Sequence, residues 1–129
     1  MPVLKLNTLW LTIGYAMVAF VVYSSLESAP IEVINFKGSD KIMHMTAYFG
    51  LMGWFLQIYH ARKAQIILAC AFITMGVILE ILQGLGGVRF FEVYDMLANS
   101  TGVLLAWSLV KTPFPQLLQY IELKVLTLD

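Results

Sequence analysis

Apolar residues run along the chain in four long stretches, and a shorter amphipathic stretch follows them near the C-terminal end. The first stretch, Leu6 to Leu26, contains no charged residue and is long enough for a transmembrane helix, which needs about 20 residues. The next three run from Ile42 to Tyr59, from Ala64 to Leu79 and from Tyr94 to Val110. This pattern predicts an all-α polytopic membrane protein with four transmembrane helices.

Local signals agree with these boundaries. A signal peptide would have an apolar region of about 7–15 residues, so we interpret the longer first stretch as an uncleaved helix. Pro30 lies in the loop that follows it. Ser39 or Asp40 can cap the second helix, because a short side-chain oxygen accepts a hydrogen bond from an unpaired amide. Gly84 and Pro113 mark the ends of the third and fourth helices.

The tail after the fourth stretch has a different pattern. Its apolar residues recur at helical spacing, and its polar residues fall on another face. We therefore expect a C-terminal amphipathic helix that lies on the membrane surface. The apolar positions are Leu118, Ile121, Val125 and Leu128, and the polar positions are Gln116, Gln119 and Glu122.

Composition strengthens the assignment to the membrane. The chain is 60% hydrophobic and 12% charged, against about 25% charged in soluble domains, and its mean hydropathy is +0.80. The formal net charge is zero and no basic run is present, so nucleic acid is not an expected partner. The lone Cys70 cannot form an internal disulfide and has no Cys or His partner at zinc-like spacing. We therefore expect it to pack as a small apolar residue. We expect no cofactor for this protein.

The distribution of lysine and arginine predicts the orientation, because the richer side of a membrane protein faces the cytoplasm. If all four stretches cross, both termini lie on the richer side and are cytoplasmic. That side carries Lys5, Arg62, Lys63, Lys111 and Lys124, and the other carries Lys37, Lys41 and Arg89.

Polar side chains gather on the side with fewer cations. His44, Glu80 and Asn99 each lie about one helical turn inside that boundary, since a helix rises about 1.5 Å per residue. Ionisable groups at membrane depth are costly, so we expect them to face the bundle interior and to form a functional site. The predicted ligand-binding residues are Asp40, Lys41, His44, Tyr48, Glu80, Gln83, Arg89, Asp95 and Asn99.

The same residues resemble the VanZ-like family, which is named for an accessory protein of teicoplanin resistance. The resemblance rests on Asp40-Lys41, His44, Tyr48, Glu80-x-x-Gln83, Arg89 and Asp95-x-x-x-Asn99-x-x-Gly102. It covers about residues 39 to 106, with Ala106 where many members have a second glycine, and the first helix and the tail carry no motif. It implies one small membrane domain, residues 1–129, in a bacterial inner membrane, and it does not transfer teicoplanin resistance.

Three classes of function stay open for this cluster. Our first choice is binding of an anionic lipid head group or a lipid-linked cell-envelope intermediate, because lysine, histidine and arginine donate to phosphate or carboxylate. The second is a membrane-embedded enzyme, in which His44 with Glu80 or Asp95 acts as acid and base. The third is a purely structural polar network.

Two further readings are weaker. A metal ion held by His44, Glu80 and Asp95 is not expected, since no compact ligand motif joins them. Transport through four short helices would need several copies of the chain, so a homo-oligomer is left open. The expected partners are membrane lipids or lipid-linked envelope precursors.

Overall fold

The structure is a computed structural model that describes residues 4–26, 39–86 and 93–127, with the side chains of residues 39 and 40 outside the description. This part of the chain is helical throughout and contains no strand. The elements are α1 (Asn7–Leu26), α2 (Ser39–Leu56), α3 (Arg62–Leu85), α4 (Val93–Trp107), the 3₁₀ turn η1 (Phe114–Gln116), α5 (Leu117–Tyr120) and the π-helical turn η2 (Ile121–Val125).

The prediction of an all-helical protein is confirmed, and each apolar stretch forms one helix. By length and composition, α1 with 20 residues and α3 with 24 could cross a membrane. The other two do not meet that test, because α4 has only 15 residues and α2, with 18, carries Lys41 and His44 near its start. That α2 and α4 also cross the membrane therefore stays a prediction.

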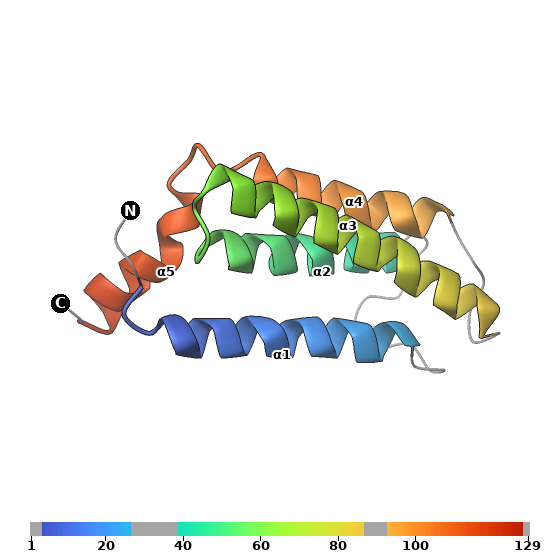
Figure 1. The fold of residues 1–129 in the computed structure, drawn as a ribbon, viewed down its shortest axis with the longest axis horizontal. Coiled ribbons are helices and arrows are strands. Elements are labelled where there is room, and N and C mark those ends of the chain that lie inside the picture. Colours follow the sequence, from blue (N-terminus) through green and yellow to red (C-terminus); the bar gives the residue numbers. More distant parts are fainter. Residues whose placement is uncertain (1–3, 27–38, 87–92, 128–129) are drawn as a thin grey trace.

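Successive helices run in opposite directions, so α2 and α4 are parallel and both begin where α1 and α3 end (Figure 1). The α2–α4 pair makes the most extensive contact in the bundle, and α1 lies as a separate layer beneath the other helices (Figure 1). The tail crosses the opposite end of the bundle and returns to the start of α1. One end of the bundle therefore carries the beginnings of α2 and α4, and the other carries the tail.

The core is built around α2. Its buried residues recur at i, i+3, i+4, i+7 and i+8, which places them along one face of the helix. They pack against Ala69 and Phe72 of α3 and against Val103 and Ala106 of α4. The α2 residues are Tyr48, Leu51, Met52, Phe55 and Leu56.

Small residues let α4 approach α2 closely. Gly102 and Ala106 are buried, as small-residue spacing in membrane helices predicts. A Cβ atom at Gly102 would collide with the carbonyl oxygen of Met45 and would lie 2.9 Å from the amide nitrogen of Phe49. The close approach of the two helices therefore depends on the missing side chain at Gly102.

Large apolar side chains also cover the outside of the bundle. Examples are Tyr15 and Phe20 on α1, Ile67 and Ile78 on α3, and Leu104 on α4, each at least half exposed. An apolar exterior around an apolar core is typical of helices that face lipid. Together with α1 and α3, this exterior favours a membrane protein.

The tail is oriented differently from the expectation of a simple amphipathic helix. Glu122 is only 2% exposed and Leu118 only 4%, so one polar and one apolar position both face inward. Glu122 accepts hydrogen bonds from the backbone amides of Lys5 and Leu6, each at 2.8 Å, and from the indole Nε1 of Trp10 at 2.7 Å. The prediction that Glu122 belongs to an outer polar face was wrong, because amides at the start of α1 need an acceptor.

Hydrogen bonding determines the charge state of Glu122. Burial by itself would raise the pKa of this carboxyl, but the hydrogen bonds from Leu6, Trp10 and Lys5 and the positive charge of Lys5 outweigh it and lower the pKa. The carboxyl is therefore ionised at neutral pH. The positive end of the α1 helix dipole also stabilises a carboxylate at this place.

Gln57 fixes the other half of the tail. Its Nε2 donates to the carbonyl oxygen of Phe114 at 2.7 Å, and its Oε1 accepts from the amide of Leu118 at 3.2 Å. His60 Nε2 lies 3.2 Å from the carbonyl oxygen of Pro115. Gln57 is buried within an apolar stretch, and only the tail above it explains its presence there.

We predict that Gly102→Ala destabilises the protein by about 1–3 kcal/mol, because the added methyl group overpacks the α2–α4 contact. The matched control is Gly50→Ala in α2, where a Cβ would meet nothing within 4 Å. This control should be neutral or stabilising by up to about 1 kcal/mol, through helix propensity. Thermal unfolding in detergent measures the stability of both variants against wild type. Equal melting temperatures for the two variants would contradict the close approach.

We predict that Glu122→Gln lowers the free energy of unfolding by about 1–2 kcal/mol at pH 7, because a charge-assisted cap is lost. Folding lowers the pKa of Glu122, so its ionised form stabilises the fold above the ordinary value of 4.5, and this stabilisation disappears as pH falls through the lowered pKa. The difference from wild type should therefore narrow in acid. Thermal unfolding from pH 3 to 8 tests this, and a pH-independent difference would refute it.

Candidate functional site

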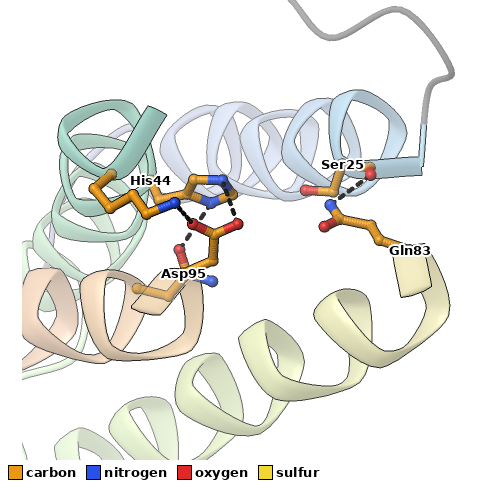
Figure 2. A network of polar contacts seen from close by, with 6 residues as sticks. Ser25, His44, Gln83 and Asp95 are labelled. Atoms are coloured by element: carbon orange, nitrogen blue, oxygen red, sulfur yellow. Dashed lines mark hydrogen bonds and ion pairs between the residues drawn. The ribbon is translucent and has the colours of Figure 1, made fainter. Parts of the chain in front are cut away.

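Four of the predicted site residues form a connected cluster where α2 and α4 begin. Lys41 Nζ lies 2.9 Å from Asp95 Oδ1, and His44 Nδ1 lies 3.1 Å from Asn99 Oδ1. His44 Nε2 lies 3.7 Å from Asp95 Oδ2, so the imidazole sits between a carboxylate and an amide (Figure 2). The structure thus brings together side chains that are more than 50 residues apart in sequence.

Helical spacing explains this arrangement. Lys41 and His44 are three residues apart on α2, and Asp95 and Asn99 are four apart on α4, so each pair occupies one helix face. Because α2 and α4 are parallel, the two pairs meet in the same order: lysine with aspartate near the end of the bundle, and histidine with asparagine one turn deeper. We call these four residues the polar ladder.

The polar ladder leads from the surface into the core. The side chains of Lys41 and His44 are 31% and 17% exposed, whereas Tyr48, one further turn along α2, is buried. Glu80 of α3 is 1% exposed and close enough to Tyr48 for an electrostatic interaction. A carboxylate and a phenol therefore lie at the inner end of the polar ladder.

Gly76 makes room for this inner end. A Cβ atom there would lie 3.1 Å from Asn99 Nδ2 and 3.4 Å from the ring of Tyr48. Sequence reasoning did not identify Gly76. The available signal was its position four residues before Glu80, which places both on the face of α3 that meets the site.

Gln83 has a different role in the structure. Its Nε2 donates to the carbonyl oxygen of Ser25 at 2.6 Å, and its side chain is buried. Figure 2 shows this contact apart from the one between His44 and Asp95. Gln83 satisfies a carbonyl in the last turn of α1, which has no partner within that helix, so it joins α3 to α1.

Two other predicted members cannot be placed. The side chain of Asp40 and the whole of Arg89 lie outside the described residues. Their membership of the site stays a prediction. Among the described residues, no group of three His, Cys, Asp or Glu side chains is arranged to hold a metal ion, so His44, Glu80 and Asp95 do not form one.

The polar ladder combines three chemical capabilities. Lys41 supplies a partly exposed cation, Asp95 supplies an acceptor, and His44 supplies a ring that can donate or accept a proton. The two ring nitrogens of His44 face different oxygens: Nδ1 faces Asn99 Oδ1, and Nε2 faces the Asp95 carboxylate at more than hydrogen-bond distance. Such a set can bind a polar ligand or exchange a proton with it.

Comparison with known proteins agrees with the motif. The sequence model of the VanZ/LLP1 family matches residues 4–118, which extends well beyond the motif-bearing part and includes α1, the whole polar ladder and the beginning of the tail. Neither the curated proteins nor the solved structures gave a match. With nearly the whole chain matched, the protein belongs to the VanZ/LLP1 family.

Proposed function

We propose that the protein binds an anionic lipid head group, or the head group of a lipid-linked cell-envelope intermediate, at the polar ladder. The observation that carries this proposal is the partly exposed ion pair of Lys41 with Asp95, which lies directly above His44. Asp95 is buried, whereas the side chain of Lys41 is 31% exposed, so the lysine is the end of this pair that a ligand can reach.

The charges of the polar ladder indicate the ligand chemistry. Lys41 can donate to a phosphate oxygen, and the parallel starts of α2 and α4 add the positive ends of two helix dipoles at the same place. Asp95 would then accept from a hydroxyl or amine of the same ligand. A phosphate that carries a hydroxyl- or amine-bearing group suits this site better than a bare phosphate does.

The position of the polar ladder relative to the membrane depends on how the helices cross it. We infer that α2 and α4 cross the membrane beside α1 and α3, with both termini in the cytoplasm, because the cation-rich end carries the tail. The polar ladder then lies about one turn below the outer boundary. A lipid head group of the outer leaflet reaches that depth from the side.

An enzymatic function is the second candidate, and His44 Nε2 supports it. In the tautomer whose Nε2 carries no hydrogen, this nitrogen would take a proton from a substrate hydroxyl, and Asp95, 3.7 Å away, would stabilise the resulting imidazolium. Nδ1 is held by Asn99, which orients the ring. Conversion of a bound lipid over time, detected by mass spectrometry, would favour this candidate over binding alone.

We expect Lys41→Gln to weaken retention of an anionic lipid about tenfold, since a hydrogen bond to a charged group contributes about 1.5 kcal/mol or more. Native mass spectrometry of the protein released from phosphatidylglycerol nanodiscs measures this retention. Lys41→Arg is the matched control, because it keeps the positive charge beside Asp95 and should retain the lipid. Equal retention by both variants, or a loss explained by a lowered melting temperature, would defeat the proposal.

The topology gives a separate expectation. In a Cys70→Ala background, a cysteine at Gly86 should react with a membrane-impermeant reagent on intact cells, whereas one at Ala61 should react only after permeabilisation. Both positions are exposed, and they lie at opposite ends of the bundle. The reverse labelling pattern would move the site to the cytoplasmic side.

A further inference from the structure

The outer face of the tail is apolar although its inner face holds a charge. Leu118 faces inward, but five other large apolar side chains of this helical segment are 43–65% exposed, while the carboxylate of Glu122 is buried. A helix end that faced water would show the opposite arrangement. We call these exposed side chains the tail stripe; they are Leu117, Tyr120, Leu123, Val125 and Leu126.

The orientation of the tail stripe is fixed by the hydrogen bonds on its inner side. Glu122 is bound to the start of α1 through three donors, and Gln57 of α2 holds the preceding turn. The segment therefore cannot rotate to bury its apolar side chains without breaking these bonds. The fold itself therefore keeps the tail stripe exposed.

The surroundings of the tail stripe are strongly cationic. Five lysine and arginine side chains are exposed at this end of the bundle, and among the described residues the only acid there is Glu122, which is buried and capped. Cations near a membrane surface contribute about 1 kcal/mol each toward anionic lipid. The cations are Lys5, Arg62, Lys63, Lys111 and Lys124.

We propose that the tail stripe and its five cations form an anchor for the anionic lipid surface of one leaflet. The apolar side chains enter the boundary between head groups and acyl chains, and the lysines and arginines contact phosphate groups around them. The tail runs across the end of the bundle from α4 to α1, so it lies beside the ends of both helices (Figure 1). This anchor lies at the opposite end from the polar ladder and does not depend on it.

Charge and apolarity together favour lipid over a second copy of the chain. Two copies meeting through this end would bring ten exposed cations together without an exposed acid among the described residues of the same surface. Like charges at a shared interface are repulsive. An anionic bilayer can bury the apolar side chains of the tail stripe and also neutralise the five cations.

The test uses the full-length protein in a Cys70→Ala background, with a nitroxide spin label at Leu123 on the tail stripe. The reference label is at Ala61, which is exposed in the α2–α3 turn at the same end and is outside the tail stripe. Collision rates with a water-soluble nickel chelate are measured in nanodiscs of phosphatidylcholine alone and with phosphatidylglycerol added. The label at Leu123 should become roughly fivefold less accessible in the anionic nanodiscs, while the label at Ala61 should change little.

A second variant checks the role of charge. Combining Lys111→Gln with Lys124→Gln should reduce the protection at Leu123 in anionic nanodiscs and leave the melting temperature unchanged, because both side chains are exposed. Equal accessibility at Leu123 and Ala61, or protection that ignores lipid charge, would overturn the anchor. Dipolar broadening between labels, which would mean that two copies meet through the tail stripe, would overturn it as well.

Discussion

The close approach of α2 and α4 at Gly102 is the constraint on which the site depends. Without a side chain there, the two parallel helices come near enough for Lys41 and His44 to reach Asp95 and Asn99. A wider separation would leave buried polar groups, such as those of Asp95 and Asn99, without their partners, which is costly. Packing of a small residue and pairing of charged residues are therefore two aspects of one contact, which runs along α4 from Asp95 to Gly102.

The two ends of the bundle use polar residues differently. At the tail end, Gln57 and Glu122 bind backbone groups of the same chain at 2.7–3.2 Å, and Glu122 also accepts from the indole of Trp10. At the other end, the polar ladder joins side chain to side chain and remains partly exposed. The first set of bonds holds the tail to the bundle, whereas the second leaves the side chains of Lys41 and His44 partly exposed. This contrast is the physical reason for placing function at the polar ladder.

Much of the fold followed from the sequence, because long apolar stretches with polar ends leave few alternatives to a helical bundle. The depth of His44 and Asn99 followed from helical rise, and their contact followed once both had to face inward. The sequence did not reveal that Gln83 pairs with Ser25, or that Glu122 turns inward. Apart from the indole of Trp10, those partners are a backbone carbonyl and backbone amides, which nearly every residue has, so no residue pattern marks them.

The contact of Glu122 with the start of α1 joins residues 117 positions apart in the chain. During synthesis, α1 leaves the ribosome before the tail does, so the acceptor for the amides at its start is made 117 positions after Lys5. Until the tail is made, α1 lacks this cap. The position of α1 in the bundle is therefore settled by a segment that is synthesised after all four long helices.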